Sequence, residues 1–244
     1  MNAKDRLYDA QVEAVQDFVF DERVVRVFPD MINRSVPGYA LIIPIIGLLA
    51  RRYAQDNSTL YDLGCSLGAG ALAMSQAVRA ENVRIVAVDN SPAMIGRLGE
   101  VLEAEQTPDR IPIEPICGDL LQTSIEDASV VVLNFTLQFV SPGARLPLLR
   151  RIARGLRPGG ILLLSEKIRF ETDLEQVLQT TWHHDFKRAQ GYSDLEISRK
   201  RDALENVMKP DSLRHHRARL LEAGFSSVHP WFQVFNFRSL VAFR

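Results

Sequence analysis

The stretch Thr59–Gly70, TLYDLGCSLGAG, constrains the fold of this chain more than any other. Short, mostly apolar, β-favouring residues run into a loop with glycines at 64, 68 and 70, and helix-forming residues follow over Ala69–Ala80. A strand that feeds a glycine-rich turn into a helix N-terminus brings backbone N–H groups close to a ligand, because no Cβ blocks the approach. The spacing is not the dinucleotide fingerprint, since Ser66 and Leu67 stand where glycines would be needed. No phosphate-loop lysine follows either.

The next expected strand, Val83–Val88, ends in Asp89. An acid at that position can accept hydrogen bonds from a ribose diol. Together, the glycine loop and this acid predict a nucleoside-containing ligand that is held without strong phosphate recognition. S-adenosylmethionine is the first candidate.

Strand and helix patterns alternate from Leu60 onward, which predicts an α/β fold with a parallel sheet covered on both faces. Beyond the glycine loop, strands are expected over 83–88, 111–116, 130–135, 161–164, 227–233 and 235–243, and helices over 91–105, 144–156, 172–189, 193–207 and 212–222. A turn is expected at 157–160. Residues 1–244 are expected to form a single domain, in which 1–55 is an N-terminal helical extension and 170–224 a helical insertion or lid.

Polar or glycine residues recur at the ends of the expected strands, namely Gly64, Asp89, Asp119, Asn134 and Glu166. Ligands bind beyond the carboxyl ends of parallel strands, so these positions predict a site. Asn134 must find partners, because it is a polar amide directly after apolar strand residues. Asp119 has an alternative role in stabilising a turn. For Glu166 a surface pair with the neighbouring lysine is the simpler interpretation.

Arg201 falls on one helical stripe with Ile197 and Leu204, whereas its neighbour Lys200 is expected to point elsewhere. A guanidinium on an apolar face needs an anion. The simpler explanation is an acidic partner within the protein, or a side chain whose apolar stem is buried and whose charged end reaches solvent. The functional alternative is that Arg201 binds a carboxylate of the ligand or substrate. Tyr39 opens an apolar helix and either packs in the core or covers a ligand. No metal site is expected from the run at 183–185, since adjacent helical residues point about 100° apart.

Composition narrows the function classes. The chain has 29 Lys and Arg against 30 Asp and Glu, so its charge indicates neither nucleic acid nor an anionic membrane as a partner. Cys65 and Cys117 do not resemble a disulfide framework or a metal site. No N-terminal signal is visible, and the apolar run Tyr39–Ala50 is too short to span a bilayer. These features predict a cytoplasmic protein.

The loop Asp62–Gly68, Asp89 and the turn at 157–160 resemble the class I S-adenosylmethionine-dependent methyltransferase fold over roughly residues 40–244. This resemblance implies a Rossmann-like, mostly parallel seven-stranded sheet with helices on both faces and a C-terminal antiparallel hairpin. Ser66, where many members have glycine, is a departure.

More specific segments resemble the carboxy-S-adenosyl-L-methionine synthase family over nearly the whole chain. They lie at 20–24, 28–31, 34–39, 88–94, 133–139, 183–188 and 231–233. The resemblance implies conversion of S-adenosylmethionine and prephenate to carboxy-S-adenosylmethionine and phenylpyruvate. It also implies a homodimer, and a product that serves a separate enzyme modifying the wobble uridine of transfer RNA.

Carried over by position, the resemblance implies that the adenosyl and methionyl parts are held by Tyr39, Gly64, Cys65, Ser66, Asp89, Asn90, Asp119, Leu120 and Asn134. Arg201 would pair with the transferred carboxylate, as the one residue given a catalytic role. Hydroxide released from prephenate, rather than a side chain, would remove a proton from the sulfonium methyl, which then captures carbon dioxide. This chemistry needs a dry, closed pocket and a cationic anchor more than a base.

Other function classes remain open at this point. An ordinary methyltransferase would share the glycine loop and Asp89 but has no need of Arg201. A non-catalytic cofactor-binding partner or a transfer-RNA-binding module would need no prephenate site, and the near-neutral charge disfavours RNA. Direct nucleic-acid binding is therefore not expected.

Overall fold

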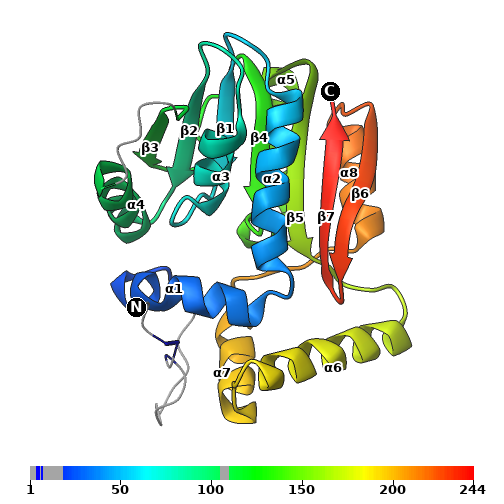
Figure 1. Cartoon of the computed structure of the whole chain (residues 1–244). Helices are drawn as coiled ribbons and strands as arrows, with labels where there is room; N and C mark the ends of the chain where they lie inside the picture. Colours follow the sequence, from blue (N-terminus) through cyan, green and yellow to red (C-terminus); the bar gives the residue numbers. More distant parts are fainter. Residues whose placement is uncertain (1–3, 6, 8–18, 105–109) are drawn as a thin grey trace.

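A seven-stranded sheet forms the centre of the computed structural model, which describes residues 4, 5, 7, 19–104 and 110–244. The strand order is β3-β2-β1-β4-β5-β7-β6, and β7 runs antiparallel to both of its neighbours, β5 and β6, whereas the other pairs are parallel (Figure 1). The strands are β1 (Thr59–Leu63), β2 (Arg84–Asp89), β3 (Ile113–Cys117), β4 (Ala128–Asn134), β5 (Leu156–Lys167), β6 (Ser227–Val234) and β7 (Phe237–Phe243). The expected mostly parallel α/β sheet with a C-terminal antiparallel pair is confirmed.

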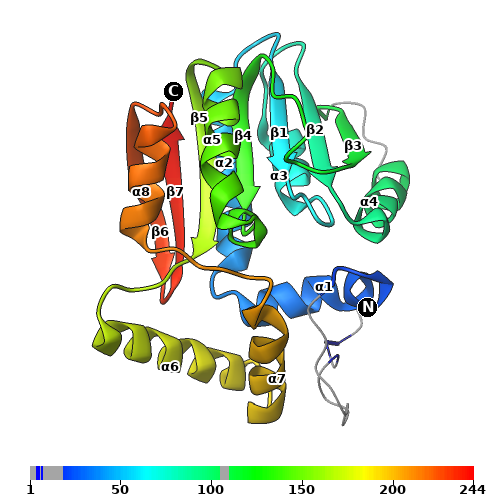
Figure 2. The same cartoon turned by 180° about the vertical axis from the view of Figure 1, so that it is seen from behind.

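Helices cover both faces of this sheet. On one face lie α2 (Tyr39–Tyr53), α3 (Ala69–Ala77) and α4 (Pro92–Ala104), and on the other lie α5 (Pro142–Gly155) and α8 (Leu213–Glu222) (Figure 2). Side chains of a strand alternate between the two faces. Leu60 therefore packs with the α2 and α3 side, whereas Tyr61 and Leu63 pack with the α5 side. The central strands β1 and β4 are buried along nearly their whole length.

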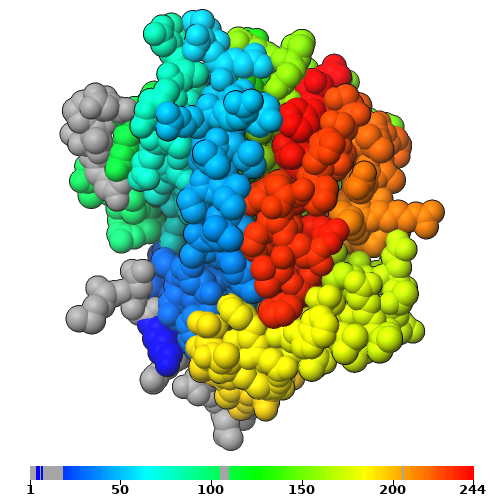
Figure 3. Space-filling model, turned by 45° about the vertical axis from the view of Figure 1, so that its right-hand side comes forward, coloured from blue at the N-terminus to red at the C-terminus, as the bar shows by residue number. Residues whose placement is uncertain are grey.

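Three further helices lie beyond the carboxyl ends of the parallel strands: α1 (Glu22–Ser35), α6 (Asp173–Ala189) and α7 (Asp194–Glu205). Together they form the lower surface of the molecule in Figure 3. The α6 helix begins after Thr172, whose hydroxyl accepts a hydrogen bond from the Glu175 N–H. The expected capping box of α7 is confirmed, because Ser193 and Glu196 each bond the other's backbone N–H.

Element boundaries differ most from the expected ones in α3 and β5. The α3 helix ends at Ala77, three residues early, because the next residue is extended. The β5 strand begins at Leu156, and the expected turn at 157–160 lies inside it as a bulge with Gly159 at φ +77°. The helix end expected at 105 lies outside the described residues.

The proline of β3 lies at a position that tolerates a missing N–H donor. Pro115 lies in a strand that pairs only with β2, so the missing N–H faces no second neighbour. Of the described helices, none is long and apolar enough to cross a membrane alone; α1 and α2 meet that length and composition test only as a pair, bent by 96°.

Candidate functional site

A cavity of about 450 Å³ opens between the carboxyl ends of the strands and the three helices beyond them. Its floor comes from the loops after β1, β2, β3 and β4, and its roof from α1, α6 and α7. Nine of the ten residues expected at the site line it, namely Tyr39, Gly64, Cys65, Ser66, Asp89, Asn90, Asp119, Leu120 and Asn134. Their roles toward a ligand stay predictions.

The glycine loop is held in a left-handed conformation that fits close approach of a ligand. Gly64 has φ +76° and Gly68 has φ +78°, and Ser66 adopts φ +49° although it has a side chain. A Cβ on Gly64 would overlap the side chain of Thr136. The N–H groups of Gly64 and Cys65 donate to the Val88 carbonyl at 2.8 and 3.0 Å, which ties the loop to β2.

Asp89 fixes the middle of this loop. Its carboxylate accepts hydrogen bonds from the N–H groups of Ser66 at 2.8 Å and Ser91 at 2.9 Å. Burial raises the pKa of Asp89, and these two hydrogen bonds oppose that rise. The side chain thus orders the loop and still lines the cavity.

Asp62, which the sequence analysis did not assign to the site, is a second cavity acid. Its carboxylate is buried at the β1 end of the floor and accepts the Ala71 N–H at 2.8 Å. Burial raises its pKa to about 7, and the charge of Asp89 adds to the rise. An acid inside an otherwise apolar strand was the signal that could have found it. Ionised Asp62 suits a cationic ligand.

Tyr39 lies at the N-terminus of α2 with its ring 6.5 Å from that of Phe135. Burial, and then the charge of Asp62, raise the pKa of its hydroxyl. Tyr39 and Asp62 both line the cavity. Cys65 and Cys117 are both free thiols, and burial raises the pKa of Cys65.

Asn134 carries the clearest sign of an absent partner. Its side-chain oxygen is buried, lines the cavity end of β4 and has no hydrogen bond to any described residue. Buried polar atoms are nearly always satisfied, so a ligand in the cavity is the natural partner. On the exposed rim, Asp119 accepts the Leu121 N–H at 2.8 Å, so it stabilises a turn and lines the cavity at once.

The expected orientation of Arg201 is wrong. Its side chain is 63% exposed, pairs with Asp202 at 3.2 Å and does not line the cavity. Lys200 points inward instead, where Nζ bonds the Ser35 hydroxyl at 2.9 Å. The buried residues of α7 are Glu196, Ile197, Lys200 and Ala203, so Ile197 of the predicted stripe is buried whereas Arg201 lies on the exposed side. The catalytic role of Arg201 stays a prediction.

The surface pair expected for Glu166 is also wrong. Glu166 is buried and accepts the N–H groups of Leu137 at 2.9 Å and Gln138 at 2.8 Å. Successive strand residues point to opposite faces, so Lys167 turns away from it and into the cavity. Burial raises the pKa of Glu166 to about 8.

The roof contributes basic groups that sequence analysis missed, namely His183 and Lys187 of α6 and Lys200 of α7. His183 Nε2 lies 2.8 Å from the Ser35 carbonyl, and its ring meets Phe237 edge-on at 4.9 Å. Burial and neighbouring lysines keep its pKa low. In the part of the chain that the structure describes, no cluster of three or more His, Cys, Asp or Glu is arranged to hold a metal ion.

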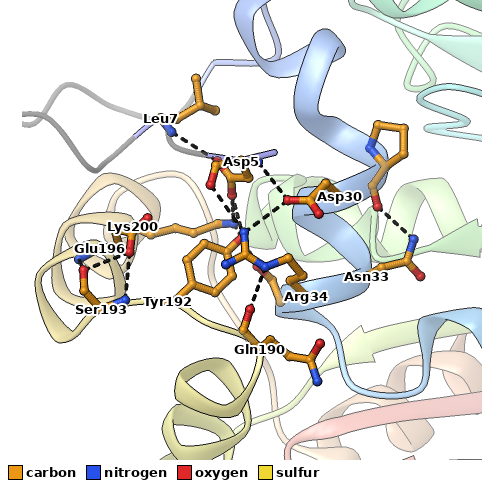
Figure 4. A network of polar contacts seen from close by, with 12 residues as sticks. Asp5, Leu7, Asp30, Asn33, Arg34, Gln190, Tyr192, Ser193, Glu196 and Lys200 are labelled. Carbon is orange, nitrogen blue, oxygen red and sulfur yellow. Dashed lines mark hydrogen bonds and ion pairs between the residues drawn. The ribbon is translucent and has the colours of Figure 1, made fainter. Parts of the chain in front are cut away.

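A polar network ties the roof together around Arg34 of α1 (Figure 4). Arg34 donates to the Gln190 carbonyl at 2.8 Å, pairs with Asp30 at 3.1 Å and stacks 4.0 Å from the Tyr192 ring centre. Asp5 accepts the Tyr192 hydroxyl and pairs with Lys200 at 3.5 Å. The network joins α1, the α6–α7 connection and α7 above the cavity.

Comparisons with known proteins agree with this architecture. A methyltransferase domain model matches residues 60–160. Among solved structures, a putative O-methyltransferase from Nostoc punctiforme has a TM-score of 0.62 at 17% identity, covering 91% of this chain and 60% of its own. Human N-acetylserotonin methyltransferase in complex with SAM has a TM-score of 0.59 at 18% identity, covering 91% and 55%. The chain thus spans under two thirds of these structures, which show the fold alone.

Curated relatives match along the full length. A protein of Trichlorobacter lovleyi is 60% identical over 240 residues, which is 98% of each chain. A protein of Vibrio campbellii is 53% identical over an alignment of 247 positions, which covers 100% of each chain. Both carry the name carboxy-S-adenosyl-L-methionine synthase. These matches include α1, α6 and α7, the helices that lie outside the methyltransferase domain match and roof the cavity.

Proposed function

The chain belongs to the carboxy-S-adenosyl-L-methionine synthase family, and from that premise we propose that it converts S-adenosylmethionine and prephenate into carboxy-S-adenosylmethionine and phenylpyruvate. S-adenosylmethionine is the substrate and carboxy-S-adenosylmethionine the product of this enzyme. The observation that carries the proposal is that one cavity holds both acidic and basic groups: Asp62, Asp89 and Asp119 beside the strand ends, and His183, Lys187 and Lys200 on α6 and α7. A cation and an anion can therefore meet inside it.

The proposed reaction balances without an external oxidant or base. Prephenate loses its ring carboxylate as carbon dioxide and its ring hydroxyl as hydroxide, which leaves phenylpyruvate. Hydroxide takes one proton from the sulfonium methyl and becomes water, and the methyl carbon bonds to the carbon dioxide. The cavity lies between the sheet edge and α1, α6 and α7. This placement supports the proposal, because side chains on both sides of the ligands hold the reacting groups close together and leave less room for bulk water.

Mass spectrometry of the products tests this proposal. Purified enzyme is incubated with methyl-labelled S-adenosylmethionine, with and without prephenate. We expect a labelled product heavier by one carboxyl group, minus one hydrogen, only when prephenate is present, with phenylpyruvate in equal amount. An ordinary methyltransferase is the alternative, and it would instead release S-adenosylhomocysteine when an acceptor is supplied. That outcome, with no carboxylated product, would reject the synthase assignment.

Arg201 keeps its proposed role as anchor for the transferred carboxylate, and its exposed position makes the role easy to test. If the guanidinium turns toward the cavity when ligands are bound, Arg201→Ala abolishes carboxylation and leaves S-adenosylmethionine affinity largely intact. Product formation by mass spectrometry and affinity by calorimetry measure the two effects separately. Unchanged product formation in Arg201→Ala refutes the role and leaves the inward-facing Lys200 as the α7 cation of the cavity.

We further propose a homodimer, cytoplasmic location and supply of the product to a separate enzyme of transfer-RNA wobble-uridine modification. An exposed apolar stripe on α6 supports the homodimer: Leu174, Val177, Leu178 and Trp182 are 72, 61, 40 and 43% exposed at helical spacing. Near-neutral net charge supports a protein that does not itself bind the RNA.

A further inference from the structure

Lysine is rare in this chain and is concentrated at the cavity. The sequence contains five lysines against 24 arginines. Three of the five, Lys167, Lys187 and Lys200, line the cavity, whereas no described arginine does. Most basic side chains of this chain are therefore arginines, whereas the basic side chains that line the cavity are lysines and a histidine.

Two of these lysines have no counter-ion in the part of the chain that the structure describes. Lys200 pairs with Asp5 and bonds Ser35. Lys187 is 8% exposed, and neither its Nζ nor that of Lys167 has a hydrogen bond or ion pair to a described residue. Burial lowers the pKa of Lys187 to about 7 and of Lys167 to about 8, and the charges of Lys200 and Lys167 add to the lowering at Lys187. Lys187 is buried and Lys167 is half-buried, and unpaired cations that face a cavity in this way are groups an anion would satisfy.

The order of charges along the sheet edge shows where an anion fits. Parallel strands follow the order β3, β2, β1, β4, β5. The cavity residues at their ends run in that order as Asp119, Asp89, Asp62, Asn134 and Lys167. The acidic end therefore suits a sulfonium ligand, and the opposite end, at β5 under α6, suits an anion.

We propose that Lys167 and Lys187 form an anion subsite that binds the carboxylate which the co-substrate keeps throughout the reaction. This inference rests on the proposed function, in which prephenate carries two carboxylates and one leaves as carbon dioxide. A group that departs cannot hold the donor in place during the reaction. The pyruvyl carboxylate is retained in phenylpyruvate, so it can hold prephenate in place throughout the reaction. Binding at this non-reacting group positions the ring carboxylate that reacts.

Binding of phenylpyruvate tests the subsite directly, because this product has only the retained carboxylate. Calorimetry is run on protein saturated with S-adenosylhomocysteine. We expect Lys187→Met to weaken phenylpyruvate binding by at least about tenfold and to raise the KM for prephenate, with S-adenosylhomocysteine affinity within about twofold of wild type. Lys167→Met is expected to act in the same direction, and Lys187→Arg to retain part of the affinity.

The methionine variants separate a ligand-binding role from a structural one. Methionine keeps the volume of the stem and removes a buried, unpaired charge, so the melting temperature is expected to stay or rise. A large loss of melting temperature in both methionine variants would show a structural role and overturn the proposal. Arg188→Gln is the matched control, since it removes one charge from the next position of α6, where the side chain pairs with Asp185 and Asp194 at the surface.

The remaining outcomes are also decisive. If wild-type protein binds no phenylpyruvate, or Lys187→Met binds it normally, the subsite proposal is wrong. If S-adenosylhomocysteine affinity falls instead, the lysines serve its methionyl carboxylate, and the proposal is again wrong. If wild-type protein makes no carboxylated product but binds phenylpyruvate through Lys187, the proposed function fails and the subsite stands.

Discussion

At the scale of single residues, the ionisation of Asp62 couples the cavity to pH. Burial raises its pKa to about 7, far above that of a solvated aspartate. Stability from the buried neutral acid is therefore complete below about pH 4 and is lost as the pH rises through 7. A cationic ligand has the opposite preference, because it favours the ionised form.

We therefore expect the affinity for S-adenosylmethionine to increase between pH 6 and pH 8 as Asp62 ionises. Asp89, whose pKa burial also raises, and Lys187, whose pKa burial lowers to about 7, line the same cavity and contribute to the measured pH dependence. Asp62→Asn keeps an acceptor for the Ala71 N–H and is expected to bind more weakly and with a flatter pH profile. Calorimetry across this pH range measures both. An identical slope in Asp62→Asn would assign the pH dependence to another group.

The backbone at Gly64 gives a second prediction at this scale. Gly64→Ala must accommodate a Cβ at φ +76° against Thr136. We expect the free energy of unfolding to fall by about 1–3 kcal/mol and ligand affinity to fall with it. Gly96→Ala, at an exposed position of α4, is the control, because no atom lies within 4 Å of the Cβ that this substitution adds. Its free energy of unfolding should increase by about 0.5–1 kcal/mol. Denaturant unfolding of both variants checks the contrast.

Strand-end residues such as Gly64, Asp89 and Asn134 could be placed from the sequence, because a parallel sheet brings carboxyl ends to one edge. The residue of α7 that points into the cavity, Lys200, could not be predicted from the sequence. Taking Ile197 as the reference, Arg201 lies about 40° and Lys200 about 60° to either side of the stripe. Partners from distant segments, Asp5 and Ser35, select Lys200, and no local pattern contains them.

At the scale of elements, the Arg34 network holds three helices over the cavity. Arg34→Ala removes the contacts to Gln190, Asp30 and Tyr192 and leaves Asp30 without this partner. We expect a loss of about 3 kcal/mol in the free energy of unfolding and faster proteolysis between α6 and α7. Arg26→Ala, at an exposed position of the same helix, should stay within about 0.5 kcal/mol of wild type. Equal proteolysis rates in the two variants would show that the network does not hold the roof.

Whether a segment forms a helix or a strand was predictable, because apolar runs and capping signals are local. The residues at which these elements begin and end were not always predictable. The β5 strand starts before the expected turn, because Leu156 pairs with Ala128 ahead of the bulge, and the pairing partner is 28 residues away in sequence. The capping box at Ser193 and Glu196 was predictable, since both halves lie within four residues.

At the scale of the whole molecule, the α6 stripe predicts how two copies associate. Val177→Glu places a charge in the centre of the exposed apolar face and is expected to convert a dimer into a monomer. Light scattering after size-exclusion chromatography measures the mass. Leu221→Glu, on the exposed side of α8, is the control and should leave the mass unchanged. A dimer that persists in Val177→Glu would place the interface elsewhere.

The position of β7 has a consequence for biosynthesis. This strand follows the six others in sequence, yet it lies between β5 and β6 in the sheet. A nascent chain that has not reached Phe237 therefore offers the apolar edge of β5, including Leu162 and Leu164, without a neighbour, and β6 has nothing to pair with. Completion of the sheet waits for residues far from the glycine loop, so truncated chains are expected to depend on chaperones or to aggregate.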